Sequence, residues 1–357
     1  MRAWLGSIVL IVALAASPWA QRVDGPTPIP PCSARHVTDE SPPIDWHAGP
    51  IKDTDALDDW CRGVGPPLVE EMPIDRAMPP RLEDLVVVTW NAHLAEGRLS
   101  DLIAQLHAGA LTDGQPVRHF VLLLQELFRR GPDVPPFGAD VRSAFAIKAR
   151  DPKAPDANAY KTALGLSLIY VPSMRNGPEL REDRGNAIVS TEPLIDPIAL
   201  ELPFERQRRV AIGASVQVRT ARGVERLNLL DVHLEPLSAP SSLWIFRNPR
   251  RRQVAAVLDL LRTSRFAETE TAAGTVLGGD FNTIQGGAEE NAYQQARAWA
   301  TSLVVEDRRS THHMGRLDYL FFRLADQRQA TTERLNERFG SDHYPVIGRI
   351  TAGHGSH

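Results

Sequence analysis

The sequence has 357 residues, with 40 Lys and Arg against 44 Asp and Glu, so its formal net charge is −4. This near balance argues against a protein that coats nucleic acid by bulk charge. Hydrophobic residues at 43% and charged residues at 24% are ordinary globular values, which excludes wholesale disorder, collagen and a coiled coil. No apolar run reaches the roughly 18 residues that span a bilayer. Two cysteines are too few for a disulfide scaffold or a cysteine-based zinc site.

Residues 1–20 predict a secretory signal peptide. Arg2 precedes an uncharged apolar stretch from Leu5 to Ala16, and the small residue Ala20 follows. A positive start, a short apolar segment and a small-residue exit are typical of such peptides. We therefore expect a secreted, periplasmic or extracellular protein. The alternatives are a buried N-terminal helix and an uncleaved signal that anchors the chain.

Residues 21–81 form a proline-rich arm. This arm holds 12 of the 28 prolines, which permit no long helix and no central strand. Cys32 and Cys61 both lie in it. In an oxidising compartment they would pair, and closing such a loop is worth about 3–4 kcal/mol on the chain-entropy model. Two unrelated thiols are the alternative. We expect an irregular, partly ordered arm that lies on the main domain.

From residue 82 onward, apolar runs separated by loops predict many strands and few helices. The predicted strands are 85–90, 119–126, 164–171, 187–190, 209–218, 227–233, 275–280, 317–322 and 346–350. The predicted helices are 99–106, 251–261 and 288–300. Because a strict alternation of strand and helix is missing, the pattern favours an α/β fold of two packed sheets flanked by helices.

Several of these strands carry a charged or amide residue at one end. Those at or just after strand ends are Asn91, Glu126, His233, Asp280 and Asn282, and those at or just before strand starts are Asp318, Asp342 and His343. A rigid sheet assembles a site from distant sequence in this way. Burying so many polar groups without partners would cost several kcal/mol, so we expect them to pair with each other, with water or with a cation.

The candidate ligands favour a hard divalent cation. Oxygen donors on Glu126, Asn91, Asp280 and Asp342, without cysteine, favour Mg²⁺, with Mn²⁺ or Ca²⁺ as alternatives. A zinc site of three histidines is a further alternative, although no HExxH spacing occurs. No G-x-S-x-G elbow, P-loop or G-x-G-x-x-G occurs, which argues against a serine hydrolase and against those nucleotide-binding folds.

Seven short motifs occur in an order that resembles a known family. They are TWN at 89–91, QE at 125–126, GNAIVS at 185–190, DVH at 231–233, GGDFN at 278–282, RLDY at 316–319 and SDHYP at 341–345. Together they resemble the endonuclease/exonuclease/phosphatase superfamily, which includes deoxyribonuclease I, AP endonucleases, inositol polyphosphate 5-phosphatases and neutral sphingomyelinases. The resemblance covers about residues 82–351, and residues 352–357 would form a tail.

The resemblance implies a four-layered α/β sandwich, in which two mostly antiparallel sheets are flanked by helices, with a divalent-metal phosphoesterase site. By the matching motifs, Glu126 would be the principal metal ligand. Asn91 would lie close by, and Asp342 would be a further ligand. The acid that many members carry two residues after this asparagine is replaced by His93, which would weaken a second metal position or shift the metal preference.

The same resemblance implies the catalytic roles. His343 would be the general base that takes a proton from the attacking water, and Asp318 would orient it and stabilise its imidazolium. Asp280 and Asn282 would position the water and the phosphate. His233 would donate to a phosphoryl oxygen or help to protonate the leaving group.

Weaker signals lie outside these motifs. Arg250 and Gln253, three residues apart at a helix start, would present donors to the substrate phosphate or pack against the site, and a solvated basic helix start is the alternative. The basic cluster 206–209 is interpreted as a loop face. His312 and His313 would either line the pocket or, as a tandem pair on a loop, be surface residues, and the second interpretation is favoured.

The sequence therefore predicts an exported, Mg²⁺-dependent phosphoesterase. Its substrate would be a nucleic acid, a phospholipid headgroup or a small phosphate ester, and we expect a monomer without an obligate protein partner. A sphingomyelinase-like phospholipid diesterase competes with the nuclease interpretation. A non-catalytic binding module on the same fold is the alternative from another class.

Overall fold

The computed structural model describes residues 44–51, 54–70, 78–94, 96–138, 141–142, 155–178, 180–236, 249–267, 272–283 and 291–352. The expected signal peptide, Cys32 and residues 353–357 lie outside these ranges. No helix within them is both long and apolar enough to cross a membrane.

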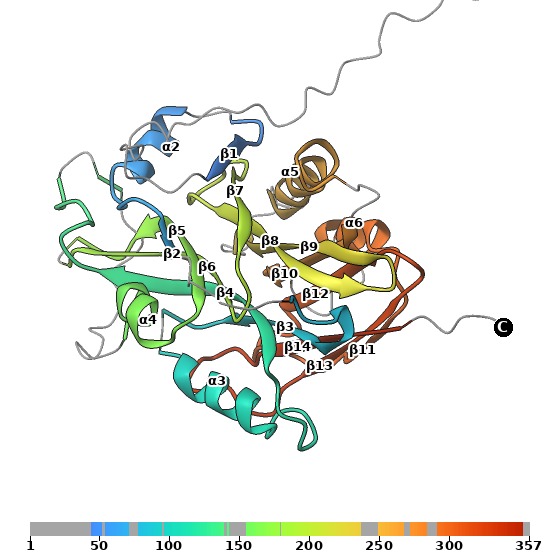
Figure 1. Cartoon of the computed structure of the whole chain (residues 1–357). Helices are drawn as coiled ribbons and strands as arrows, with labels where there is room; N and C mark the ends of the chain where they lie inside the picture. Colours follow the sequence, from blue (N-terminus) through green and yellow to red (C-terminus); the bar gives the residue numbers. More distant parts are fainter. Residues whose placement is uncertain are drawn as a thin grey trace, which may run out of the picture.

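Two sheets stack face to face at the centre of the molecule (Figure 1). The six-stranded sheet has the order β1 (Asp45–Ala48), β7 (Ile195–Glu201), β8 (Val210–Thr220), β9 (Gly223–His233), β10 (Ala272–Asp280), β12 (Asp318–Leu324). The eight-stranded sheet has the order β11 (Val304–Glu306), β13 (Gln329–Arg334), β14 (Val346–Thr351), β3 (Leu85–Asn91), β4 (His119–Arg130), β6 (Glu182–Ser190), β5 (Ser167–Arg175), β2 (Leu68–Glu70). The pairs β1–β7, β9–β10, β3–β4 and β11–β13 are parallel. The other described pairs are antiparallel, so both sheets are mixed.

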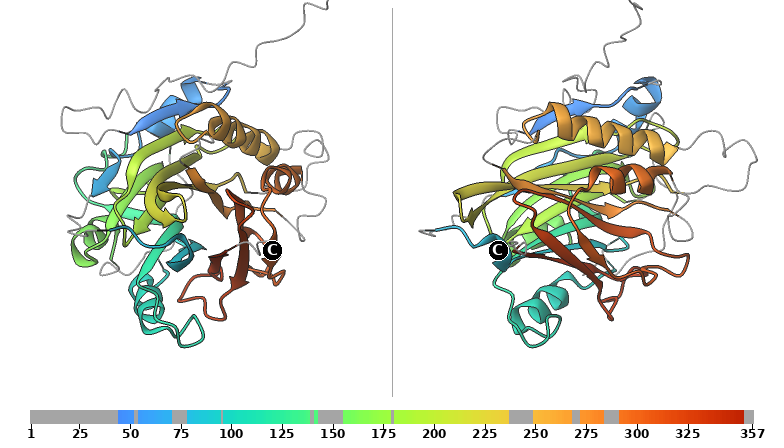
Figure 2. Two further views of the ribbon diagram at one scale, coloured as in Figure 1. Left: turned by 45° about the vertical axis from the view of Figure 1, so that its right-hand side comes forward. Right: turned by 90° about the vertical axis from the view of Figure 1, so that its right-hand side faces the viewer.

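Helices cover the two outer faces of this pair of sheets (Figure 2). The helices are α2 (Thr54–Cys61), η1 (Leu82–Asp84), α3 (Leu99–Ala108), α4 (Ala157–Ala163), α5 (Pro249–Thr263) and α6 (Asn291–Trp299). Apolar residues of α3 and α4 pack on the eight-stranded sheet, and those of α5 and α6 pack on the six-stranded sheet. The predicted four-layered α/β sandwich is confirmed.

Both faces of each sheet are buried, which explains the continuous apolar strands in the sequence. Val87 and Leu229 point into the core between the sheets. Their neighbours Val88 and Leu230 point to the opposite faces, under the helices. Because successive side chains of a strand alternate between faces, a strand buried on both sides needs an apolar residue at nearly every position.

All nine predicted strands and all three predicted helices are present, most of them longer than predicted. The sequence did not predict five strands, namely β1, β2, β7, β11 and β13. It also did not predict the helices α2, η1 and α4. Three of these strands, β1, β2 and β11, lie at sheet edges. An edge strand buries little apolar surface, so it leaves a weak signal in the sequence.

The described part of the proline-rich arm is more regular than expected. β1 pairs with β7 and β2 pairs with β5, so the arm adds an edge strand to each sheet. Proline is tolerated at edges because an edge strand leaves one row of N–H groups unpaired. Cys61 is buried at the end of α2. Its pairing with Cys32 stays a prediction, because Cys32 lies outside the described residues.

The strand directions bring the polar strand ends to one edge of the sandwich. β3 and β4 are parallel, and so are β9 and β10, so each pair ends on the same side. β14 runs antiparallel to β3 and β12 runs antiparallel to β10, so both begin at that side. In the six-stranded sheet, Asp280 is directly opposite His233 on one neighbour and Asp318 on the other.

A polar contact joins the two sheets just inside this edge. Gln125 Nε2 on β4 donates to Asp231 Oδ1 on β9 at 2.6 Å and also lies 3.2 Å from Thr89 Oγ1. All three side chains are fully buried. Burial, with a smaller effect of Asp280, raises the pKa of Asp231 well above its usual value. The protonated acid is therefore favoured at this position.

We expect the free energy of unfolding of Asp231→Asn to increase relative to that of the wild type as the pH rises. The unfolded carboxyl ionises near pH 3.9, whereas burial opposes ionisation in the folded protein, so the stabilising contribution of this residue falls as the pH rises above about 4. The amide keeps an oxygen for Gln125 and does not ionise. Urea unfolding at about pH 5 and about pH 8 measures the difference between the two proteins. An equal difference at both pH values would contradict the raised pKa of Asp231.

Candidate active site

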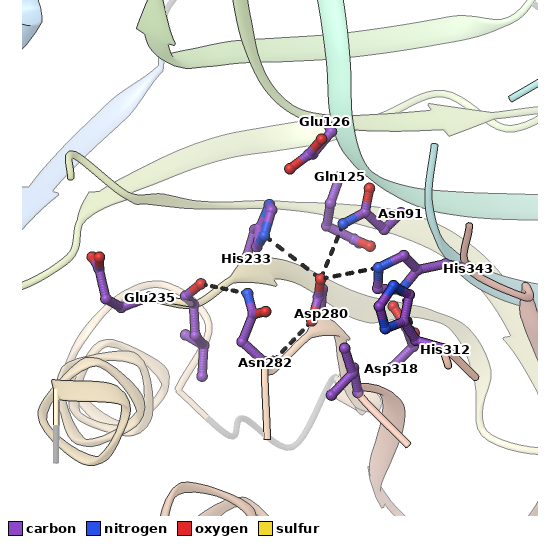
Figure 3. Close-up of polar contacts among 12 residues, drawn as sticks. Asn91, Gln125, Glu126, His233, Glu235, Asp280, Asn282, His312, Asp318 and His343 are labelled. Atoms are coloured by element: carbon purple, nitrogen blue, oxygen red, sulfur yellow. Dashed lines mark hydrogen bonds and ion pairs between the residues drawn. The ribbon is translucent and has the colours of Figure 1, made fainter. Parts of the chain in front are cut away.

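An open cleft of about 320 Å³ lies at this edge of the sandwich. The residues that line it are Asn91, His93, Leu94, Glu126, Arg184, Gln207, Arg209, His233, Pro236, Asp280, Asn282, Asp342 and His343. Seven of the predicted metal and catalytic residues therefore line one cleft, and the eighth, Asp318, lies in contact with His343. Figure 3 labels these residues apart from Asp342.

His343 and Asp318 form a buried pair that joins the two sheets. His343 Nδ1 donates to Asp318 Oδ2 at 2.8 Å, and its Nε2 lies 3.9 Å from Asp280 Oδ2. Burial opposes the charged imidazole, but the Asp318, Asp280 and Asp342 carboxylates raise the pKa of His343 to about 10.

The backbone around His343 is fixed from three sides. Ser341 Oγ donates to Asn91 O at 2.7 Å and accepts from His343 N at 3.0 Å. Trp90 Nε1 donates to His343 O at 3.2 Å. These contacts explain the serine of the SDHYP motif and the tryptophan of the TWN motif, since both hold the segment that carries the imidazole.

The Asp280 carboxylate is the centre of the site. Its Oδ2 accepts from Asn91 Nδ2 at 3.0 Å and lies 3.6 Å from His233 Nε2, and its Oδ1 accepts from Asn282 N at 2.8 Å. Burial and the neighbouring Asp318 raise the pKa of Asp280 to about 6. Gly279 precedes it with a φ of 140°, and a Cβ there would lie 1.9 Å from Val232 O. Only glycine fits at this position.

A bulge in β4 aims Glu126 at the cleft. Leu124 and Leu127 both pack on the helix-covered face although they are three residues apart, so the alternation of the strand breaks between them. Glu126 has a φ of 56° within this bulge. Bulges re-aim side chains next to active sites in this way. Glu126 Oε2 lies 3.6 Å from Arg184 Nη1.

His93, which stands where an acid was expected, pairs with Asp342. His93 Nδ1 lies 2.9 Å from Asp342 Oδ1, and Asn91 Oδ1 accepts from His93 N at 3.0 Å. The Asp342 carboxylate raises the pKa of His93. Although burial opposes it, His93 and His343 hold the pKa of Asp342 well below its usual value.

His312 is buried beside the site, so the favoured interpretation of it as a surface residue was wrong. Met314 N donates to His312 Nδ1 at 3.2 Å, which leaves Nε2 to donate to Asp342 Oδ2 at 3.3 Å. The His312 and His343 rings are 4.5 Å apart. His313 is exposed, as expected. Two adjacent histidines in a polar loop show no hydrophobic periodicity, so the sequence does not indicate which of them is buried.

Two arginines of the cleft were not predicted as site residues. Arg184 directly precedes the GNAIVS motif, and Arg209 belongs to the basic cluster that we interpreted as a loop face. Burial, followed by the charges of Arg209 and Arg184, lowers the pKa of His233 well below its usual value. His233 is therefore neutral near pH 7.

Gln253 is held by neighbouring backbone groups. Its Oε1 accepts from Glu235 N at 2.9 Å, and its Nε2 donates to Pro203 O at 3.3 Å. Arg250 is buried on the same helix, and neither residue is among the described residues that line the cleft. Gln253 thus fastens α5 to the segments beside it, and contact of either residue with the substrate stays a prediction.

The residues of the cleft fit a hard divalent cation. Carboxylates of Glu126, Asp280 and Asp342 and the amide oxygen of Asn91 line it, and oxygen donors of this kind suit Mg²⁺, Mn²⁺ or Ca²⁺. Asp280 and His343 also belong, with Asp318, to a group whose ligand atoms lie within 4.8 Å of one another. Asp318 Oδ1 is buried without a hydrogen-bond partner among the described residues.

A His–Asp pair beside clustered acids and amides, at one edge of two stacked sheets, supplies the groups that metal-assisted hydrolysis of a phosphate ester needs. The model of the endonuclease/exonuclease/phosphatase family matches residues 88–343, and the chain belongs to this family. It is accordingly a hydrolase of phosphate esters, and enzymes of this family depend on a divalent metal.

Solved structures with related architecture cover about three quarters of the chain. A family member from Bacteroides thetaiotaomicron has 12% identity and a TM-score of 0.47 over 74% of this chain and 97% of its own. A mannosyl-6-phosphatase of the same species has 11% identity and a TM-score of 0.46 over 75% and 99%. A Staphylococcus aureus beta toxin mutant with bound magnesium has 16% identity and a TM-score of 0.45 over 74% and 98%. No curated protein matches the chain. The assignment therefore rests on the family match.

In the metal-free protein at pH 7.5, we expect His343 to be protonated on both nitrogens and His233 to be neutral. The reason is that Asp318 stabilises the His343 cation, whereas burial and two arginines oppose a charge on His233. Nitrogen-15 NMR of the imidazoles measures both states, and His343→Ala and His233→Ala assign the signals. Asp318→Asn should lower the pKa of His343. An unchanged His343 titration in that variant would contradict the role of the pair.

Proposed function

We propose that this protein is an exported hydrolase that cleaves a phosphate ester by attack of water, with His343 as the general base and Mg²⁺ as the cation. One observation carries the proposal. His343 uses Nδ1 to donate to Asp318 at 2.8 Å, so its Nε2 is left to accept a proton at the cleft, beside Asp280.

The neutral form of His343 removes a proton from water through Nε2. A cation held by the neighbouring carboxylates would favour this form, because it would offset the negative charges that raise the pKa of His343 in the metal-free protein. The water oxygen forms a bond to phosphorus, the ester P–O bond breaks, and the leaving oxygen keeps the electron pair until it gains a proton. Asp318 stabilises the imidazolium that forms, and a positioned general base of this kind contributes roughly 10²–10⁴ in rate. Asp280 and Asn282, linked at 2.8 Å, position the water and the phosphate.

His233 donates a hydrogen bond to a phosphoryl oxygen. Because burial and the neighbouring arginines lower the pKa of His233, the neutral ring is the form present near pH 7. A neutral imidazole offers an N–H donor but is a poor source of a full proton. The structure thus favours the first of the two roles expected for this residue.

Glu126 and Asp342 would hold the cation, with Asn91 Oδ1 beside them. When bound, the cation neutralises charge on the non-bridging oxygens of the phosphate. Asn91 Nδ2 donates to Asp280, so the amide also fixes the central carboxylate in place. The paired histidine, His93, keeps the Asp342 carboxylate ionised and oriented.

Export, a monomeric state and the choice among nucleic acid, phospholipid headgroup and small phosphate ester belong to the same proposal. The apolar segment after Arg2 supports export. The near-neutral charge supports a substrate smaller than a long nucleic acid, since a long polyanion is bound through many basic contacts.

We expect Glu126→Gln to reduce turnover by at least about 100-fold, because the neutral amide is a poor cation ligand. The measurement is hydrolysis of plasmid DNA, RNA, sphingomyelin and inositol phosphates with Mg²⁺, Mn²⁺ or Ca²⁺. EDTA should remove the activity, and added metal should restore it. Glu333→Gln, which changes an exposed carboxylate on β13, is the matched control. Turnover that resists EDTA would contradict the scheme, and a biological role intact in Glu126→Gln would favour the binding module.

We expect the exported protein to lack residues 1–20 and to contain the Cys32–Cys61 bond. Mass spectrometry of protein from the extracytoplasmic fraction, with and without reduction, measures both the new N-terminus and the two hydrogens lost on oxidation. Leu14→Arg interrupts the apolar segment and should retain the protein in the cytoplasm. An N-terminus that still begins at Met1 outside the cytoplasm would contradict cleavage.

A further inference from the structure

Acidic and basic side chains both line the cleft. Glu126, Asp280 and Asp342 are the acids, and the cation is expected on Glu126 and Asp342. Arg184 and Arg209 also line the cleft, and they come from β6 and from the segment just before β8. The general base and the cation account for the acids and His343, whereas no step of the proposed reaction uses either arginine.

Arg209 carries buried donors that are incompletely used. Its side chain is only 4% exposed, and Nη2 makes a long contact of 3.3 Å to Gln207 Oε1. Nε is buried and has no hydrogen-bond partner among the described residues. An unsatisfied buried guanidinium is unfavourable in the free protein, and a bound anion would supply the missing acceptors.

The preceding residue, Arg208, is an arginine whose donors have close acceptors. Arg208 Nε donates to both oxygens of Glu201 at 3.1 and 3.0 Å, and Nη1 donates to Pro172 O at 2.7 Å and Ser173 O at 3.2 Å. Arg208 thus fastens the start of β8 to neighbouring strands. Arg209, its neighbour in the chain, lines the cleft instead.

Arg184 is also held only weakly. Nη1 lies 3.6 Å from Glu126 Oε2, which is longer than a hydrogen bond, and Nη2 donates to Met174 Sδ at 3.2 Å. A thioether is a weak acceptor. A cation on Glu126 would compete with this long ion pair and leave the Arg184 guanidinium for another anion.

The positive charges of the two arginines act on the same region. Both lower the pKa of the buried His233, and Arg184 opposes the charge on Arg209. Glu235 is the acid that favours the Arg209 cation most strongly. It is itself buried, and burial raises its pKa. Arg184, Arg209 and His233 all line the same cleft, so a phosphate bound beside His233 would lie in a cleft lined by two guanidinium groups.

We propose that Arg184 and Arg209 form a subsite for the terminal oxygens of a dianionic phosphate, so that the preferred substrate is a phosphomonoester. The proposal rests on the proposed function, since it names the ester class hydrolysed in the same cleft. A monoester has three terminal oxygens and up to two negative charges, which suits the planar forks of two arginines together with a cation. A diester has one negative charge and carries an ester carbon on one of those oxygens.

The reaction balances without a further reactant. Water adds its oxygen to phosphorus, and the bond between phosphorus and the ester oxygen breaks. The proton taken by His343 and the one left on the water are distributed between the released alcohol and the phosphate. The products are an alcohol and inorganic phosphate, and the second of these should itself bind to the arginine subsite.

The test compares p-nitrophenyl phosphate with bis(p-nitrophenyl) phosphate, which share a leaving group but differ in ester class. We expect Arg209→Met to lower kcat/KM for the monoester by at least about 100-fold and for the diester by less than about 10-fold. Arg184→Met should act in the same direction. Arg206→Met is the matched control, because Arg206 is exposed in the same basic cluster and does not line the cleft. Equal losses on both esters would overturn the subsite.

A binding measurement separates this proposal from the proposed function. Titration calorimetry with inorganic phosphate should show binding to the wild type that is lost in Arg209→Met and kept in Arg206→Met. If the wild type hydrolyses neither ester, the proposed function fails while this titration still decides whether the subsite exists. Phosphate binding that is unchanged in Arg209→Met overturns the subsite.

Two further variants distinguish loss of the arginine subsite from misfolding of the protein. Arg209→Lys keeps a charge opposite Glu235 but removes the planar fork, and we expect a monoester-specific loss of at least about 10-fold. Glu235→Gln combined with Arg209→Met avoids an uncompensated buried acid. Thermal unfolding of each variant checks the fold. A lysine variant with wild-type selectivity would contradict recognition by the guanidinium fork.

Discussion

Two hydrogen bonds that cross from one sheet to the other hold the active site together. Asn91 on β3 donates to Asp280 on β10, and His343, in the segment that leads into β14, donates to Asp318 on β12. Neither bond survives a change in how the sheets stack, because each joins a part of the eight-stranded sheet, or the segment leading into it, to the six-stranded sheet. The large apolar core between the sheets therefore determines the catalytic geometry. Packing of that core is resistant to small displacements, since interiors are as dense as organic crystals.

Several charged side chains of the site are buried, and this burial explains the shifts in their pKa values. Asp280, Asp318 and His343 are all nearly buried, so each would be costly alone. Together they compensate one another: the acids stabilise the His343 cation, while burial raises the pKa of Asp280. Two arginines and a neutral His233 line the same cleft. The cleft therefore offers carboxylates that suit a cation and guanidinium groups that suit an anion.

Much of the site was predictable because strand ends are visible in the sequence. Asn91, His233 and Asp280 each stand at the end of an apolar run. A polar residue in that position indicates a polar side chain at the end of a buried strand. The residues that were misinterpreted lack such a signal. Arg209 is one of several arginines in a short segment, and only the fold separates it from Arg208. His312 is likewise separated from its neighbour His313 only by the direction in which the loop turns.

The amino-acid sequence by itself determined the central strands, the family and most of the polar residues at the edge of the sandwich. These properties are local, since hydrophobic periodicity and short motifs can be read without knowing what lies nearby in space. Only the tertiary structure decided which polar residues meet, which face the cleft, and which protonation state each prefers. Those properties depend on distances between side chains far apart in the chain and on the water excluded between them. The bulge that aims Glu126, the pairing of His93 with Asp342 and the separate fates of two adjacent arginines all follow from that packing.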